Sequence, residues 1–316
     1  MLEIKEGELK RVLLQEKKIM HKDVCLKPYS KAGCIGNRNT ICKAIYNAMF
    51  EFIIYKIQKA LNPSANEKLS SINLLDIFGF ENFSDNSLEQ LCINFTNEKL
   101  LKQYNKYVFE NEMVILKEDG LEKEIENIRP PTNDDVIWLL SSELSLFSII
   151  NDNTPNAQFK DEDMISGFQR KFNKNKLMRF DLLKKNNFTI IHSQCEVTYN
   201  IDGFKFKNQD KINQDIEDIY KKLFENENKN QAGKTLLKKF EKEIEDLVTE
   251  LSSASNHFVR CIKPNEEKKA NTVDAIYMLT QVRYLGVFET IQIRQKTFPS
   301  RKLYPDFIKT FLPIFR

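Results

Sequence analysis

Apolar residues recur every three or four positions along much of the chain, a spacing typical of amphipathic helices. One clear example runs from Ile41 to Ile53 and ends near Pro63, because proline does not continue a helix. The helices predicted from this spacing are residues 1–18, 41–62, 87–119, 136–150, 160–175, 210–224, 236–252 and 272–294, the last interrupted at Gly286.

Shorter apolar or alternating runs, bounded by turn residues, predict strands. These strands are residues 71–75, 188–192, 196–200 and 257–262, with a further extended segment at 23–28. Residues 188–192 and 196–200 are separated by a short turn and are expected to pair with each other. The sequence therefore predicts an α/β fold that is rich in α-helix.

Composition narrows the class of protein. The net charge of +3 is small, and lysines alternate with glutamates, which argues against a nucleic-acid partner. The six cysteines lack CxxC pairs and nearby histidines, so we interpret them as reduced thiols of a cytoplasmic protein. The charged N-terminus does not look like a signal peptide. There is also no apolar run of about 18 residues, so no membrane span is expected.

The segment from Leu74 to Glu81 carries the most chemical information. Asp76 directly follows an apolar run that is predicted to be a strand, so it lies at the carboxyl end of that strand. Nucleotides bind at the carboxyl ends of the strands in open α/β sheets. Three residues later, Gly79 permits close approach of the backbone, so that its N–H can point at a phosphate. The Asp-x-x-Gly pattern also occurs at ordinary strand-to-loop turns. By itself it leaves both interpretations open.

The surrounding residues make the pattern specific. Residues 76–81 resemble the switch II loop of myosins, and residues 94–103 (NFTNEKLLKQ) resemble the early part of their relay helix. Further along, residues 257–265 are similar to a strand and turn of the myosin sheet. Residues 281–294 are similar to the paired reactive-thiol helices, and residues 298–307 to the opening of the converter. On these motifs the chain is identified as part of the motor domain of an unconventional myosin.

This resemblance implies four functional parts. They are residues 1–70 (the end of the upper subdomain and a long entry helix), 71–256 (switch II, relay helix and the lower, actin-binding subdomain), 257–296 (a sheet strand and the thiol helices) and 297–316 (the start of the converter). It implies a partial head of the P-loop-NTPase type with an incomplete central sheet. The usual thiol positions hold Tyr284 and Arg294, so thiol reactivity is not implied. Residues 132–152 are similar to the short myosins of apicomplexan parasites.

The resemblance also implies ATP and magnesium as cofactors. Asp76 would hold the magnesium ion through water, and Gly79 would donate to the γ-phosphate. Glu81 would form the closing ion pair that positions the attacking water. Gly286 would be the mechanical pivot between the thiol helices.

A phosphate-binding loop is not found in the sequence. Residues 232–235 (AGKT) match the end of such a loop, but Asn228 stands where its first glycine belongs, and the preceding residues are wholly polar. We interpret this stretch as part of a surface loop that faces actin. The resemblance places the phosphate loop and switch I before Met1, so ATPase competence of this chain is left open. A glycine-switch GTPase is disfavoured, since no base-recognition motif accompanies Asp76.

F-actin is the partner that the resemblance implies. Asp23 falls at an actin-loop position that is acidic or phosphorylatable in myosins, although a solvated carboxylate is the alternative. Residues 147–172 would supply an exposed apolar helix–turn–helix. The lysines of the surface loop would supply positive charge, or else are ordinary solvated side chains; they are Lys229, Lys234, Lys238 and Lys239.

We therefore predict a portion of an actin-based motor, in which ATP hydrolysis at switch II is transmitted along the helix over residues 87–119. The alternative is a non-catalytic actin-binding remnant of a truncated gene. The other implied partners are the N-terminal half of the head and, through a neck absent from the chain, light chains. His192 is predicted to be buried and hydrogen-bonded, and Trp138 to pack in the core. Unpaired strand edges are expected to make the isolated chain unstable or insoluble.

Overall fold

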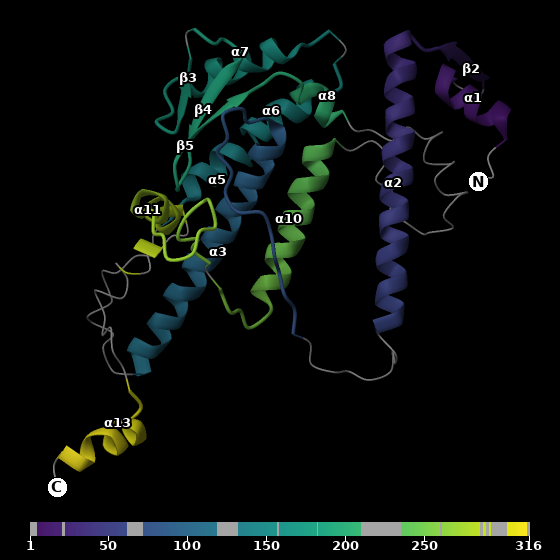
Figure 1. The fold of residues 1–316 in the computed structure, drawn as a ribbon. Helices are drawn as coiled ribbons and strands as arrows, with labels where there is room; N and C mark the ends of the chain where they lie inside the picture. Colours follow the sequence, from purple (N-terminus) through teal and green to yellow (C-terminus); the bar gives the residue numbers. More distant parts are fainter. Residues whose placement is uncertain are drawn as a thin grey trace. The chain divides into compact units, whose positions relative to one another are not determined.

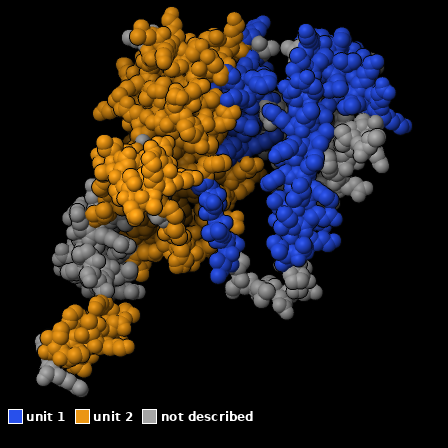
Figure 2. Space-filling model, viewed as in Figure 1, with its two compact units in different colours: residues 1–77, 151–158, 203–240 blue, residues 78–150, 159–202, 241–316 orange. Residues whose placement is uncertain are grey.

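The computed structural model describes residues 5–20, 23–61, 72–118, 132–156, 158–181, 183–209, 235–259, 261–284, 287–288, 291 and 302–314. Its helices and sheets are drawn in Figure 1. The chain divides into two compact units, each assembled from three separate segments (Figure 2). Unit 1 comprises Met1–Ile77, Asn151–Gln158 and Gly203–Phe240, and unit 2 comprises Phe78–Ile150, Phe159–Asp202 and Glu241–Arg316.

Unit 1 begins with a helix and a hairpin. Helix α1 (Glu6–Leu14) leads directly into strand β1 (Gln15–Met20), which pairs antiparallel with β2 (Asp23–Pro28). The helix predicted over residues 1–18 is therefore too long. The backbone is already extended at Gln15, with φ −134° and ψ 134°, because the residues that follow bond to β2. The predicted extended segment is confirmed as β2.

The long helix α2 (Lys31–Leu61) confirms the helix predicted to end near Pro63. It begins ten residues before residue 41, where the predicted helix started. It packs on α1 through a small core in which Ile41 and Ala44 meet Val12. The other large apolar side chains of α2 are mostly exposed; they include Tyr46, Met49, Phe50, Phe52, Ile53, Tyr55 and Leu61. Apolar surface of this extent is typical of a face that contacts another protein segment.

Unit 2 is built around α3 (Leu88–Glu118), which confirms the predicted long helix. The single helix predicted over residues 136–150 is instead two helices, α5 (Asp134–Leu140) and α6 (Leu146–Asn153), separated by a turn. Helix α7 (Asp161–Phe172) confirms the amphipathic helix predicted there. The fully buried side chains of α5, α6 and α7 include Leu139, Leu140, Leu146, Phe147, Ile150 and Phe168.

A three-stranded antiparallel sheet, in the order β3–β4–β5, completes the core of unit 2. The strands are β3 (Met178–Phe180), β4 (Asn187–Ile191) and β5 (Glu196–Asn200). The predicted strand pair is confirmed as β4 and β5, whereas β3 was missed because three residues are too few to show alternation. Phe188 stands opposite Tyr199, and their buried rings stack with centroids 5.5 Å apart.

The remaining helices complete the described chain. They are α8 (Phe204–Asn208), α10 (Leu236–Ser252), α11 (Ala275–Tyr284) and α13 (Tyr304–Phe311), with a 3-10 turn at Leu312–Ile314. Helix α10 has the predicted bounds, and α11 covers the first part of the helix predicted to start at Thr272. The helix predicted over residues 210–224 lies outside the described residues. Among the helices that are described, none has the length and apolar character needed to cross a bilayer.

Three further sequence predictions are wrong in the part of the chain that the structure describes. Of the strand predicted at residues 71–75, the described residues 72–75 form no strand, and the exposed fractions of Ile72 and Leu74 are 101% and 95%. In the strand predicted at residues 257–262, the described residues 257–259 and 261–262 likewise form none. A strand needs a neighbour for its backbone bonds, and the described residues place none beside either run. Trp138 is 57% exposed, because the apolar residues around it on α5 occupy the buried face instead. The α-rich α/β fold class itself is confirmed.

Candidate functional site

The extended segment before α3 carries the predicted phosphate-sensing residues. Asp76 and Gly79 are both exposed. A Cβ atom added at Gly79 would meet nothing within 4 Å, so its backbone is open to an approaching group. An exposed carboxylate and an exposed glycine are compatible with a magnesium-bound phosphate. The roles assigned to Asp76 and Gly79 remain predictions.

Glu81 is held more firmly, and its anchor is Asn94 on the first turns of α3. The Glu81 N–H donates to Asn94 Oδ1 at 2.8 Å, and Asn94 Nδ2 donates to the Glu81 carbonyl at 2.8 Å. The half-buried Glu81 carboxylate accepts a bond from Gln90 Nε2 at 3.2 Å. Both main-chain polar groups of Glu81 are therefore satisfied by one buried amide side chain.

The turn between Glu81 and α3 is fixed to the sheet as well. Asn86 is 2% exposed; its Nδ2 donates to the Phe83 carbonyl at 2.9 Å and to the Thr198 carbonyl on β5 at 3.0 Å. Its Oδ1 accepts from the Phe83 N–H at 2.8 Å. The segment that holds Glu81 is thus tied both to α3 and to β5.

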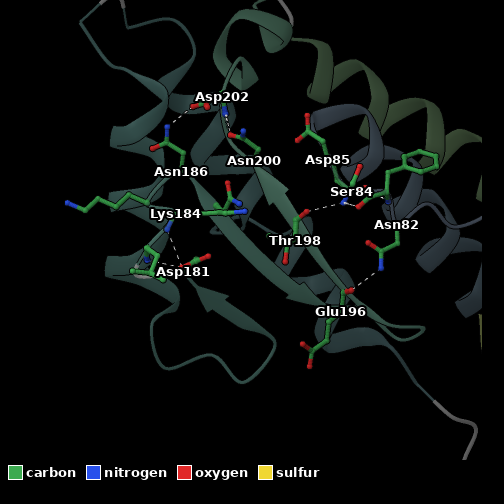
Figure 3. A pocket seen from close by; sticks show the side chains of 15 residues that line it. Asn82, Ser84, Asp85, Asp181, Lys184, Asn186, Glu196, Thr198, Asn200 and Asp202 are labelled. Atoms are coloured by element: carbon green, nitrogen blue, oxygen red, sulfur yellow. Dashed lines mark hydrogen bonds between the residues drawn. The ribbon is translucent and has the colours of Figure 1, made fainter.

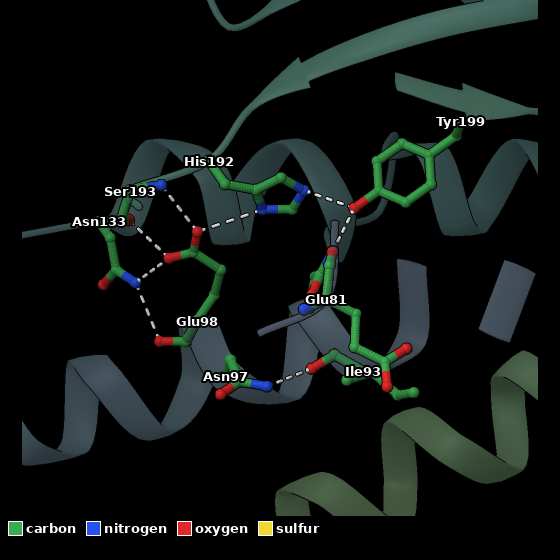
Figure 4. Close-up of polar contacts among 9 residues, drawn as sticks. Glu81, Ile93, Asn97, Glu98, Asn133, His192, Ser193 and Tyr199 are labelled. Atoms are coloured by element: carbon green, nitrogen blue, oxygen red, sulfur yellow. Dashed lines mark hydrogen bonds and ion pairs between the residues drawn. The ribbon is translucent and has the colours of Figure 1, made fainter. Parts of the chain in front are cut away.

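The carboxylate of Glu98, one helical turn beyond Asn94 on α3, is buried (Figure 4). Glu98 is 1% exposed and accepts from the Ser193 N–H at 2.8 Å, the Ser193 hydroxyl at 2.6 Å and Asn133 Nδ2 at 2.5 Å. His192 Nδ1 lies 3.2 Å from Glu98 Oε1, and His192 Nε2 lies 2.8 Å from the Tyr199 hydroxyl. The prediction that His192 is buried and hydrogen-bonded is confirmed.

The surroundings set the ionisation of this cluster. Burial alone raises the pKa of Glu98, but the hydrogen bonds that it accepts, the strongest of them from His192 and the others from Ser193 and Asn133, hold the pKa below its ordinary value. Burial also raises the pKa of the Tyr199 hydroxyl, more than the bond from Asn94 lowers it. Glu98 is therefore ionised and Tyr199 neutral near pH 7.

Asn94 and Glu98 were not predicted from the sequence as individual sites. A signal was present, because these two residues lie four positions apart and therefore on one face of α3. That face also carries Leu91 and Leu101, which are buried. Polar residues on an apolar helix face need buried partners, and here the turn between β4 and β5, strand β5 and the residue that precedes α5 supply them.

A polar groove of about 1040 Å³ opens beside the Glu81 turn (Figure 3). Its lining comes from the turn at residues 82–86, the connection from β3 to β4 and the exposed face of β5. Charges of both signs border it; the charged residues are Asp85, Asp181, Lys184, Lys185, Glu196 and Asp202. Among the described residues, no group of histidines, cysteines or carboxylates is arranged to hold a metal ion.

Helix α3 also contacts the segment that precedes α11. Tyr104 and Tyr107 pack against the ring of Phe258, with centroids 5.0 and 5.6 Å away. Beyond that ring, the Gln281 side chain on α11 accepts from the Lys263 N–H and donates to the Lys263 carbonyl, both at 2.9 Å. Contacts therefore run from Glu81 to α3 and from α3 to Phe258, and separate hydrogen bonds join Lys263 to α11, all within unit 2.

The other predicted site residues are dispersed. Asp23 is the first residue of β2, and Lys238 and Lys239 lie in the first turn of α10, exposed and half-buried respectively. Lys229, Lys234 and Gly286 lie outside the described residues.

Two further expectations can be compared with the packing. The hydroxyl of Thr235, the last residue of the AGKT stretch, is buried and donates to Asn151 Oδ1 at 2.6 Å, so it is not open to a ligand. The apolar helix pair over residues 147–172 was expected to be exposed. Instead Phe147 and Phe168 are 0% exposed, because they fill the core of unit 2.

Comparisons with known proteins identify the family. The family model for the myosin head (motor domain) matches residues 1–315. The high molecular weight form of myosin-1 from Acanthamoeba castellanii is 33% identical over 90% of this chain and 19% of its own length. Myosin-2B of Naumovozyma castellii is 34% identical over 87% of the chain and 21% of its length. Human unconventional myosin-Vc is 28% identical over 98% of the chain and 20% of its length.

The chain thus spans about a fifth of the length of these relatives. The match covers both compact units and both ends of the described structure. It also includes the Glu81 segment, α3 and the buried cluster around Glu98. This chain belongs to the myosin head (motor domain) family.

Proposed function

We propose that this chain is a portion of an actin-based cytoskeletal motor, in which it couples the state of a nucleotide to movement along F-actin. The observation that carries the proposal is the set of contacts that run from Glu81 to α3 and from α3 to Phe258. A change in the position of Glu81 would move α3, a rigid helix of 31 residues, and would not be absorbed by a flexible loop.

Within this proposal, ATP and magnesium bind next to the extended segment before α3. Asp76 holds the magnesium ion through water, the Gly79 N–H donates to the γ-phosphate, and Glu81 orients the attacking water. The magnesium ion supplies neutralisation of the charge that develops on the phosphoryl oxygens. The lysines that precede and begin α10, together with Asp23, contribute to the actin-facing surface, and Gly286 is the pivot of the thiol helices.

Hydrolysis also requires a phosphate loop and a switch I arginine, and no motif of either kind is recognised in this sequence. The test therefore combines the chain with a polypeptide that carries these parts of a myosin head. Actin-activated ATP hydrolysis is expected in the combination, and Glu81→Ala is expected to abolish it. The matched control is Glu143→Ala, which removes an exposed carboxylate away from the Glu81 segment. Normal hydrolysis by Glu81→Ala would show that the role proposed for Glu81 is wrong.

A non-catalytic actin-binding remnant is the second candidate function. It is favoured by the exposure of Ile72 and Leu74, which have no strand partner among the described residues. Co-sedimentation with F-actin separates the two candidates. A motor portion combined with its complement is released from actin by ATP, whereas a remnant stays bound at every ATP concentration.

A further inference from the structure

The hydrogen bonds that join Glu81 to Glu98 have a defined direction. The Glu81 N–H can only donate, so the Asn94 atom that it meets must be the amide oxygen. The two hydrogens of Asn94 Nδ2 are then directed at the Glu81 carbonyl and at the Tyr199 hydroxyl oxygen, each 2.8 Å away. Tyr199 therefore accepts from Asn94, and its own hydrogen is left for another acceptor.

The acceptor for the Tyr199 hydrogen is His192 Nε2, at 2.8 Å. A histidine nitrogen that accepts carries no hydrogen, so the ring hydrogen of neutral His192 is on Nδ1. Nδ1 faces Glu98 Oε1 at 3.2 Å, and a carboxylate accepts such a bond. The hydrogen bonds therefore form a chain with a single direction: Asn94 donates to Tyr199, Tyr199 donates to His192, and His192 donates to Glu98.

Protonation of His192 conflicts with this arrangement. With hydrogens on both ring nitrogens, Nε2 would also donate to the Tyr199 oxygen, which already accepts from Asn94. The hydroxyl hydrogen of Tyr199, a residue that is 0% exposed, would then lose its acceptor. A buried hydroxyl without a partner is costly, so the cluster would have to rearrange at Asn94 or at His192.

We infer that Tyr199 and His192 are positioning residues for Glu81, which act through Asn94 and do so only while His192 is neutral with its hydrogen on Nδ1. The consequence for catalysis rests on the proposed function, because it requires Glu81 to orient the attacking water. The positioning itself does not depend on it.

The groups around His192 define what can influence its protonation. Glu98 faces it from α3 and Tyr199 from β5, while Phe80 contributes a ring whose centroid lies 5.2 Å from that of the imidazole. Two thiols also act on this cluster through Tyr199, namely Cys195 from the turn before β5 and Cys92 from α3. Burial, reinforced by Glu89 and Glu241, raises the pKa of Cys92 to about 12, so this thiol stays neutral.

The first experiment measures the tautomer of His192 in the unmodified chain by nitrogen-15 NMR of labelled histidine. The chain has three histidines, which are assigned by replacing His21 and His257 in turn. At a pH where the ring is neutral, we expect His192 to carry its hydrogen on Nδ1. Detection of the Nε2–H tautomer would overturn the inference.

The second experiment measures amide hydrogen exchange at low protein concentration in Tyr199→Phe, which removes only the hydroxyl. We expect exchange of the Glu81 amide to rise about tenfold or more, as for a local opening. The Phe83 amide, which bonds to Asn86, serves as the internal reference and should change little. The matched variant Tyr107→Phe removes a hydroxyl from α3 away from the cluster and should leave the Glu81 amide unchanged.

Two outcomes would contradict positioning. If Tyr199→Phe left exchange of the Glu81 amide unchanged, the Tyr199 hydroxyl would not position the loop that carries Glu81. If exchange rose equally at Glu81, Phe83 and throughout α3, the role of Tyr199 would be general stability. Neither measurement uses ATP or actin, so failure here leaves the proposed motor function standing, and failure of the ATPase test leaves this inference standing.

Discussion

The Asn94 side chain closes two hydrogen bonds, each 2.8 Å long, on the main chain of Glu81. A side-chain amide that bonds to both the N–H and the carbonyl of one residue fixes the position of that backbone more firmly than a single bond would. The loop that carries Glu81 is thereby joined to α3 at the start of the helix. Movement of this loop and movement of the helix are then one event.

Replacement of Asn94 by Ala should destabilise unit 2. The change leaves the Glu81 N–H and the Glu81 carbonyl without a partner and removes one of the two hydrogen bonds of the Tyr199 hydroxyl, so we expect a loss of about 1–3 kcal/mol. Urea unfolding followed by circular dichroism measures the effect. The control Gln103→Ala, on the same helix and half-buried, should have a much smaller effect. Equal effects of the two variants would show that Asn94 has no special role.

Acidification should weaken unit 2 through Glu98. The pKa of this carboxylate is lower in the folded protein than its ordinary value of 4.5, so it contributes stability that is complete above about pH 4.5. That contribution is lost as the pH falls through the folded-state pKa. In Glu98→Gln, which cannot titrate, the decline of the melting temperature between pH 5 and the acid limit of about pH 3 should be shallower. An identical decline in both proteins would mean that other carboxylates control acid unfolding.

Much of the helical framework could be predicted from the sequence, because apolar spacing alone defines long amphipathic helices. The bounds of α3 and α10 follow the pattern to within a residue. The strand predictions at residues 71–75 and 257–262 failed for the opposite reason. An apolar run shows that a segment is suited to a sheet, but pairing depends on a neighbour, and none is placed beside either run among the described residues.

The candidate site was predicted unevenly for a similar reason. Asp76, Gly79 and Glu81 were found because their spacing forms a local motif. The partners of Glu81 were not found, because Asn94 and Tyr199 are 105 positions apart in sequence and meet only through the fold. Trp138 was placed in the core on residue type alone, whereas the helix face decides exposure.

In unit 1, Asn208 should be the residue that secures the start of α10. Its Oδ1 accepts from the Leu237 N–H at 2.9 Å, and its Nδ2 donates to Thr154 and Asn151 at 2.8 and 3.1 Å. Asn208→Ala removes the acceptor of the buried Leu237 N–H and the bonds to Thr154 and Asn151, with an expected loss of about 1–3 kcal/mol. Helix N-termini need such acceptors, so exchange of the Leu237 amide should also increase. Asn187→Ala, at the edge of β4 in unit 2, is the control, and an equal loss there would contradict the prediction.

The isolated chain should self-associate, because residues 72–75 of the extended segment before α3 present apolar side chains and have no strand partner among the described residues. Ile72 and Leu74 are 101% and 95% exposed, and edges of this kind recruit further strands. The double variant Ile72→Lys with Leu74→Lys should therefore reduce the aggregate measured by light scattering several-fold at equal concentration. Leu183→Lys is the matched control, since Leu183 is 94% exposed but lies in the short connection between β3 and β4. If the unmodified chain is monomeric and melts cooperatively, or if the Leu183 variant is equally effective, association does not arise from the extended segment. If the Leu183 variant is equally effective, the next surface to change is the exposed apolar face of α2, because that face would then contribute more to association than residues 72–78.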